Sequence, residues 1–87
     1  MNKKLSILLP VFNEKESLAI FVRLLKSSIN FENEILIIYD NINDNSVDVA
    51  KKLATELPNV KAIHNDNNNG VRFAIDKGVK ESKYEII

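Results

Sequence analysis

Three turns of this chain carry aromatic or charged side chains directly after an apolar run. The first turn contains Phe12 and Glu14, the second begins with Asp40, and the third leads to Arg72. An aromatic ring can stack on a flat base, a carboxylate can accept the imino hydrogen of a pyrimidine, and a guanidinium can pair with a diphosphate. A charge-assisted hydrogen bond contributes roughly 1.5–3 kcal/mol. We expect a nucleoside-binding cleft where the three turns meet.

The elements that must position these turns are apolar runs separated by segments of helical periodicity. Predicted strands cover residues 5–11, 34–40, 60–64 and 84–87, with a predicted helix between each strand and the next. Strands that alternate with helices predict a parallel sheet built from right-handed crossovers. We therefore expect an α/β fold, a Rossmann-like three-layer sandwich with strand order 3-2-1-4. Such sheets bind ligands at the carboxyl ends of their strands, where the three turns are expected.

Local signals predict how the helices begin, pack and end. Asn13 followed by Glu16 has the spacing of a capping box. Asn45 or Ser46 can cap the second helix, and Pro58 ends it. The apolar residues expected on one face of the first helix are Leu18, Phe21, Val22 and Leu25, and the third predicted helix contains Ala74, Ile75 and Val79.

The turn after the first strand excludes several nucleotide-binding classes. It lacks the Gly-x-Gly-x-x-Gly of dinucleotide-binding domains and the Gly-Lys-Ser/Thr of P-loops. Glu14 and Glu16 already complement the positive end of the helix dipole, so a phosphate at that point would meet negative charge. A receiver-type signalling domain needs paired acidic residues where this chain has Pro10-Val11-Phe12, and the Gly-rich turn of nucleotidyltransferases is also absent. The turn is better suited to a base and a ribose.

Composition narrows the remaining choices. The chain has 87 residues, with 12 Lys and Arg balanced by 12 Asp and Glu, and no cysteine. A neutral balance gives no sign of a nucleic-acid partner or a polybasic membrane anchor. Without cysteine there is no disulfide or thiolate zinc site, and a reducing cytoplasm is compatible. No segment approaches the roughly 20 apolar residues of a membrane span, so we expect a soluble, cytoplasmic chain.

Each candidate residue also has a structural interpretation. Phe12 could cover the end of the sheet, and Asp40 could simply begin a turn. Asp44 fits a turn or a helix cap better than a ligand contact, and Arg72 fits a solvated helix surface equally well.

Three further features are expected to be structural. His64 has no second histidine or cysteine beside it with which to bind a metal. The asparagine-rich segment 65–69 is typical of a loop that tolerates left-handed backbone angles. Gly78 lies inside the third predicted helix, where it would permit close packing on the sheet at a cost of about 1 kcal/mol in helix propensity.

Motifs along the whole chain resemble those of family 2 glycosyltransferases of the GT-A fold. Pro10-Val11-Phe12-Asn13-Glu14 resembles the Pro-Val-Tyr-Asn-Glu motif that opens this family. The stretch from Tyr39 to Ser46 is similar to the family's Asp-Asp-Gly-Ser-Thr-Asp-Gly-Thr stretch, with Tyr39 in place of the first Asp and Asn41-Ile42-Asn43 in place of Gly-Ser-Thr. Asn69-Gly70 followed by Ala74 and Gly78 resembles its Asn-x-Gly…Ala…Gly region.

The resemblance implies a role for individual positions. Asp40 matches the second acidic residue of the family's pair, which holds the nucleobase, and Asp44 matches the acidic residue four positions later. Arg72 lies where a basic residue often approaches the nucleotide. The residues that the resemblance assigns to nucleotide binding are Pro10, Phe12, Glu14, Asp40, Asp44 and Arg72.

The resemblance also implies what lies outside this chain. It places the metal-binding Asp-x-Asp after the fourth strand, just beyond Ile87, with the catalytic base and acceptor site later still. Residues 1–87 are then a single domain, the N-terminal nucleotide-binding part of an incomplete GT-A fold, with no catalytic residue and no metal ligand of its own. We expect the full-length enzyme to use Mg²⁺ or Mn²⁺, and this fragment alone to be inactive.

Partners follow from the same resemblance. The donor is expected to be a nucleoside-diphosphate sugar, most commonly UDP-linked in this family, with GDP or dTDP as alternatives. The full-length protein could act in the cytoplasm or at the inner face of a membrane. A non-catalytic nucleotide-binding or protein-interaction module on the same scaffold is the alternative. The outer edge of the fourth strand is expected to lack a partner, which predicts self-association.

Overall fold

The computed structural model describes residues 4–29, 32–66 and 71–86. Its elements, in chain order, are β1 (Leu5–Val11), α1 (Lys15–Ser28), β2 (Asn33–Tyr39), α2 (Val47–Glu56), β3 (Val60–His64), α3 (Val71–Glu81) and β4 (Glu85–Ile86). Every predicted strand and helix is present, and the alternating parallel α/β architecture is confirmed. None of the helices in these ranges is both long and apolar enough to cross a membrane.

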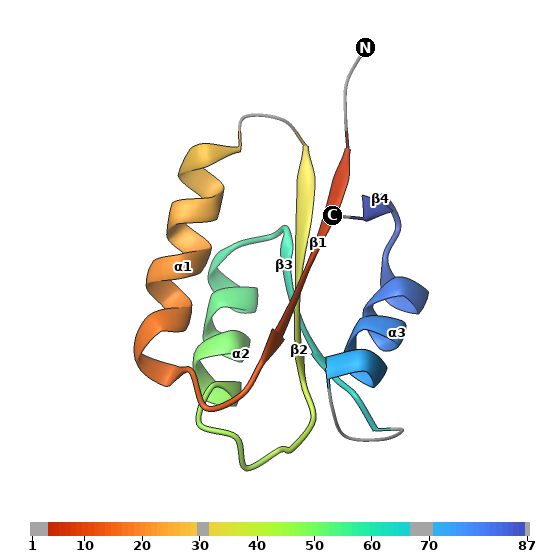
Figure 1. Ribbon diagram of the computed structural model, residues 1–87. Helices are drawn as coiled ribbons and strands as arrows, with labels where there is room; N and C mark the ends of the chain where they lie inside the picture. Colours follow the sequence, from red (N-terminus) through yellow and green to blue (C-terminus); the bar gives the residue numbers. More distant parts are fainter. Residues whose placement is uncertain (1–3, 30–31, 67–70, 87) are drawn as a thin grey trace.

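The strands form one parallel sheet in the order β3-β2-β1-β4. Val11 at the end of β1 is paired with Tyr39 at the end of β2, and Tyr39 is paired with His64 at the end of β3. These strands therefore end in register, and the turns that follow them lie at one edge of the sheet (Figure 1). β4 pairs with β1 only at the opposite end, where Leu5 faces Glu85 and Ser6 faces Ile86.

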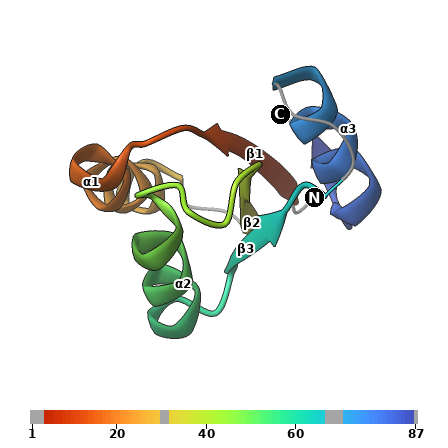
Figure 2. The same cartoon turned by 90° about the horizontal axis from the view of Figure 1, so that it is seen from below.

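Helices cover both faces of the sheet, with α1 and α2 on one side and α3 on the other (Figure 2). The central strand β2 has a continuously apolar sequence because helices cover both of its faces. Ile35 and Ile37 pack in the core beneath α1 and α2, whereas Leu36 and Ile38 pack on the α3 side with Ala74. A strand buried on both faces has no polar side, so β2 lacks the alternation of apolar and polar residues that is typical of a half-exposed strand.

The prediction that Gly78 permits close packing is confirmed. A Cβ atom at this position would lie 2.6 Å from Cδ1 of Ile38 and 2.9 Å from Cδ2 of Leu8. Real carbon atoms do not approach so closely. The third helix therefore rests its backbone directly on β1 and β2.

The predicted apolar face of the first helix is wrong at one position, because Phe21 is 49% exposed. In α3, Ile75 and Val79 are also exposed, whereas Ala74 is buried. In α1 only Leu18 and Val22 are fully buried, because the helix contacts the sheet along a narrow stripe. Phe21 lies beside that stripe, where helical spacing alone cannot distinguish it from a core position.

Candidate functional site

The candidate site lies at the carboxyl edge of the sheet, where β1, β2 and β3 end (Figure 1). Phe12 follows Val11, and Asp40 follows Tyr39, its paired residue on the neighbouring strand. Phe12 is 78% exposed, so its ring does not cover the sheet. The strand register thus brings the predicted aromatic and acidic residues to the same edge, on adjacent turns.

Asp40 is held by the end of β3. The side-chain amide of Asn65 donates a 2.8 Å hydrogen bond from Nδ2 to Oδ1 of Asp40. Nε2 of His64 lies 3.0 Å from the Asp40 carbonyl oxygen, and since a carbonyl only accepts, this nitrogen carries the hydrogen. The His64 ring also stacks on Tyr39, with centroids 5.2 Å apart. Both the backbone and the carboxylate of Asp40 are therefore fixed from β3.

Asp44 joins the turn after β1 to the turn after β2. Both of its carboxylate oxygens accept the backbone N–H of Asn13 at 3.0 Å, and Oδ1 also accepts the N–H of Ser46 at 2.7 Å. Burial by itself raises the pKa of this carboxyl, but the hydrogen bonds from Ser46 and Asn13 outweigh it and hold the pKa below its ordinary value. Asp44 is therefore ionised and bound to two backbone segments at neutral pH.

Two more side chains of the second turn cap the start of α1. The Ser46 hydroxyl accepts the backbone N–H of Glu14 at 2.6 Å, and Oδ1 of Asn45 accepts that of Lys15 at 3.1 Å. In return, the N–H of Asn45 donates to Oδ1 of Asn13 at 3.2 Å. We call these four residues, Asn13, Asp44, Asn45 and Ser46, the inter-loop clasp. It satisfies amides that a helix start otherwise leaves unpaired.

The predicted helix caps are therefore wrong in detail. The N-cap of α1 is Glu14 rather than Asn13, and no side chain of its own turn caps the helix. Asn13 instead has a φ of 49°, a left-handed conformation that asparagine tolerates. Ser46 is the N-cap residue of α2, but its hydroxyl bonds to Glu14 and not to its own helix. The partners come from another turn, which local spacing cannot reveal.

The remaining predicted residues differ in how they relate to this edge. Pro10 lies within β1, opposite Ile38. Glu14 is exposed and lines an open hollow of about 460 Å³ with Asn13, Lys15, Glu16, Ser17 and Asn45. Arg72 is the second residue of α3, but its side chain lies outside the described residues, as does the predicted Asn69-Gly70 motif.

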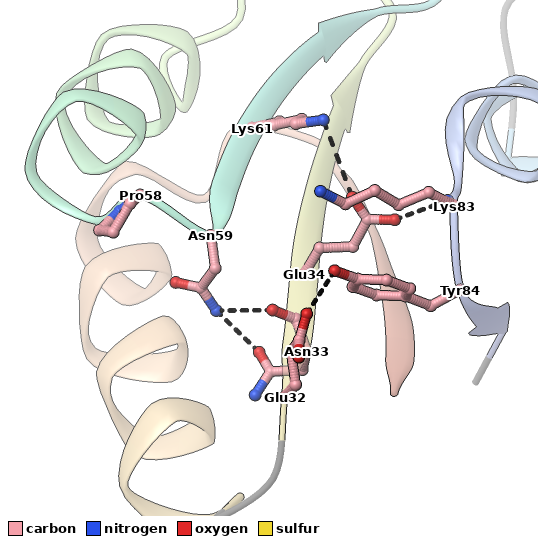
Figure 3. Close-up of a pocket in the computed structure, with 8 residues that line it drawn as sticks. All are labelled: Glu32, Asn33, Glu34, Pro58, Asn59, Lys61, Lys83 and Tyr84. Carbon is pink, nitrogen blue, oxygen red and sulfur yellow. Dashed lines mark hydrogen bonds and ion pairs between the residues drawn. The ribbon is translucent and has the colours of Figure 1, made fainter. Parts of the chain in front are cut away.

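A second hollow, of about 200 Å³, lies at the opposite edge of the sheet (Figure 3). Its lining residues are Glu32, Asn33, Glu34, Pro58, Asn59, Lys61, Lys83 and Tyr84. Glu34 is only 2% exposed, and its Oε2 accepts the Ser6 hydroxyl at 2.6 Å and the Lys83 N–H at 2.8 Å. Its Oε1 lies 3.8 Å from Nζ of Lys61.

Several polar groups of this second hollow bind one another, although Oε1 of Glu34 accepts no hydrogen bond from the described residues. The N–H of Tyr84 donates to the Ser6 hydroxyl at 3.0 Å, and the Tyr84 hydroxyl donates to Glu32 at 2.6 Å (Figure 3). That bond to Glu32 raises the pKa of the Tyr84 phenol. These contacts attach the segment before β4 to β1 and β2. We therefore assign this hollow to the closure of the sheet rather than to ligand binding.

The described ranges contain no group of three or more His, Cys, Asp or Glu side chains that could hold a metal ion.

Sequence reasoning missed two features of the carboxyl edge. The sequence predicts that Asn45 or Ser46 caps the second helix, and not that both side chains bind the start of the first, and it predicts only a loop role for Asn65. Asn65 is in fact 2% exposed. The only available signal was the abundance of asparagine in both turns, which does not specify a partner.

Comparison with known proteins places the sequence beside one family. The sequence pattern of the family described as Glycosyl transferase family 2 matches residues 6–87. The uncharacterized glycosyltransferase YibD of Escherichia coli (strain K12) is 32% identical over 77 residues, covering 88% of this chain and 22% of that protein. The chain thus spans about a fifth of the length of this relative.

Proposed function

Because the chain belongs to glycosyl transferase family 2, we propose that it binds the nucleoside diphosphate of a sugar donor at the carboxyl edge of its sheet. One observation carries this proposal: Phe12 and Asp40 directly follow Val11 and Tyr39, which are paired on adjacent strands. An exposed ring and a fixed carboxylate on neighbouring turns are the two groups that a base requires. Pro10 and Glu14 flank them and complete the proposed base and ribose pocket.

The carboxylate of Asp40 favours bases that carry an imino hydrogen. Uracil and thymine offer N3–H, and guanine offers N1–H, whereas cytosine and adenine present an acceptor at the equivalent ring nitrogen. Phe12 stacks on the base regardless of its identity. The proposed donor is therefore UDP-linked, with GDP and dTDP as alternatives, and CDP and ADP are disfavoured.

The diphosphate is proposed to lie away from the start of α1. The backbone N–H groups of Asn13, Glu14 and Lys15 already donate to the inter-loop clasp. An anion at a helix start needs such donors, and here they are occupied. The diphosphate is proposed to lie near the third turn instead, where Arg72 is the proposed cation that pairs with it. Asp44, whose carboxylate binds two backbone segments, is proposed to act by holding the first turn.

Sugar transfer by the whole protein is a proposal that rests on the family. Residues 1–87 are proposed to be its N-terminal nucleotide-binding part. The family implies Mg²⁺ or Mn²⁺, and the proposed metal ligands and catalytic base lie outside these residues. We expect no turnover by this chain in an assay with a labelled UDP-sugar and added Mg²⁺ or Mn²⁺. Product formation would contradict that expectation.

A nucleotide titration tests the proposed site directly. We expect UDP to shift the backbone amide resonances of Phe12 and Asp40, and calorimetry to give a dissociation constant for CDP at least tenfold higher than for UDP. Tenfold corresponds to about 1.4 kcal/mol, the low end for a charge-assisted hydrogen bond. Unchanged resonances, or equal affinity for UDP and CDP, would contradict the site.

Self-association through β4 is a separate proposal. β4 spans two residues and is the last strand of the sheet, which ends in the order β2-β1-β4. β4 pairs with β1 only at Leu5 and Ser6, so within the described residues the rest of this edge of β1 has no strand partner, and unpaired strand edges recruit other chains. Sedimentation over a range of concentrations is expected to show dimerisation, and a strictly monomeric chain would argue against it.

A further inference from the structure

Asn65 places a buried amide against the carboxylate that the proposed site depends on. It is the first residue after β3, and its backbone N–H continues the sheet by donating to the carbonyl of Tyr39 at 2.8 Å. Its side chain is 2% exposed, and Nδ2 donates to Oδ1 of Asp40 at 2.8 Å. A buried amide at the end of an apolar strand is costly unless it is hydrogen-bonded. The hydrogen bond to Asp40 therefore offsets part of the cost of burying the Asn65 amide.

This hydrogen bond restricts the direction of the Asp40 carboxylate. An aspartate at a strand end can rotate about both side-chain bonds, and a donor fixed in the neighbouring strand limits that rotation. A carboxylate offers about four acceptor sites, so it can take the Asn65 amide and a nucleobase hydrogen at once. His64 holds the carbonyl of the same residue at 3.0 Å. His64, the last residue of β3, thus holds the backbone of Asp40, and Asn65, the residue after it, holds the side chain.

We propose that Asn65 is a positioning residue that sets nucleobase selectivity by orienting the carboxylate of Asp40. This inference rests on the proposed function, because it concerns the same nucleotide site. Asn65 itself makes no contact with the base in this proposal. Its removal lowers the affinity for UDP more than for CDP, because only the imino hydrogen uses the oriented carboxylate.

The Asn65→Asp variant tests this through its pH profile. The variant keeps the shape of the side chain but replaces the amide donor by a carboxylate facing Asp40. At pH 7.5 the two carboxylates repel, and we expect UDP to bind about tenfold more weakly than to the unsubstituted chain. As the pH falls toward 5, two close carboxylates share one proton, the donor returns, and UDP affinity recovers.

Two residues next to the Asn65–Asp40 pair define the controls. His64 contacts the Asp40 carbonyl and is present in both proteins, so the difference between the two pH profiles is the measurement. Asp66→Asn is the matched control, since this carboxylate is on the next residue and pairs with Lys77 at 3.9 Å. We expect it to bind UDP like the unsubstituted chain, with the same preference over CDP.

A measurement on the unsubstituted chain tests the inference even if the Asn65→Asp variant does not fold. We expect the side-chain amide resonances of Asn65 to shift when UDP is added and not when CDP is added at the same concentration. If the variant fails to fold, this shift supports the inference and its absence overturns it.

The two proposals fail in different ways. If the unsubstituted chain does not bind UDP, the proposed function fails and the inference fails with it. If that chain binds UDP but Asn65→Asp has the same affinity, selectivity and pH profile, the inference alone is overturned.

Discussion

The two edges of the sheet each contain a buried carboxylate, but the two carboxylates join different kinds of segment. At the carboxyl edge, Asp44 binds backbone amides in two turns, and Phe12, the residue before Asn13, is 78% exposed. At the amino edge, Glu34 binds Ser6, Lys83 and Lys61, and the surrounding polar groups bind one another (Figure 3). The contacts of Asp44 fix the turns after β1 and β2 and leave the Phe12 ring exposed to solvent. The contacts of Glu34 attach the segment before β4 to the sheet.

Because the two edges differ in this way, substitutions at each edge can distinguish effects on nucleotide binding from effects on stability. Both carboxylates link residues far apart in the chain, 31 positions for Asn13 and Asp44 and 49 for Glu34 and Lys83. The carboxyl edge presents an exposed ring, Phe12, and a carboxylate fixed on the adjacent turn, Asp40, which are the two groups that the proposed site offers to a base. We therefore expect changes at the amino edge to lower stability, and changes at the carboxyl edge to lower nucleotide affinity as well or instead.

The largest effect on stability is expected from Glu34→Ala. The substitution leaves the buried Ser6 hydroxyl and the backbone N–H of Lys83 without their acceptor, and we expect a loss of about 3 kcal/mol. Urea unfolding followed by circular dichroism measures this loss. Glu32→Ala is the control, because Glu32 is exposed and its loss is expected to cost less than about 1 kcal/mol. A loss as small as that of Glu32→Ala would show that the contacts of Glu34 do not stabilise the fold.

Asp44→Asn is expected to have a smaller effect on stability and a clear effect on binding. The new amide nitrogen cannot accept the N–H of Asn13, so one oxygen must serve both donors, and we expect a loss of about 1–2 kcal/mol. Amide hydrogen exchange at Phe12 and Asn13 should accelerate, and UDP affinity should fall about tenfold. Normal affinity in a folded variant would mean that the inter-loop clasp does not position the first turn.

Acid should weaken the carboxyl edge through the same residue. The pKa of Asp44 is lower in the folded chain than its ordinary value of 3.8, so its contribution is present above that value. It is lost as the pH falls through the folded pKa. The free energy of unfolding of the unsubstituted chain should therefore fall more steeply below pH 4 than that of Asp44→Asn. Parallel curves would contradict the lowered pKa.

Phe12→Ala is expected to have the smallest effect on stability. The ring is exposed, so the free energy of unfolding should change by less than about 0.5 kcal/mol. The loss of base stacking should nevertheless raise the dissociation constant for UDP several-fold, by about 0.5–1.5 kcal/mol. Phe21→Ala is the control, because this ring is half-exposed on α1 and contributes nothing to the proposed site. Unchanged affinity in Phe12→Ala would remove the ring from the site.

Much of the fold could be read from the order of residues because hydrophobic periodicity is a local property. The run from Leu5 to Val11 became β1 with those bounds, and Val60 to His64 became β3. Gly78 could be assigned to close packing because a helix interior otherwise disfavours glycine. The acidic start of α1 already argued against a phosphate there, whichever side chain caps the helix.

Hydrogen-bond partners from distant turns could not be read in the same way. Asn13 and Asn45 looked like caps of their own helices, and Asn65 looked like a loop residue, since each can satisfy such a role locally. Strand register brought these turns together, and each side chain then bonded across the edge to a neighbouring turn or strand end. Local patterns in a chain reveal which segments are buried, whereas the polar contacts among them depend on which segments become neighbours after the sheet has formed.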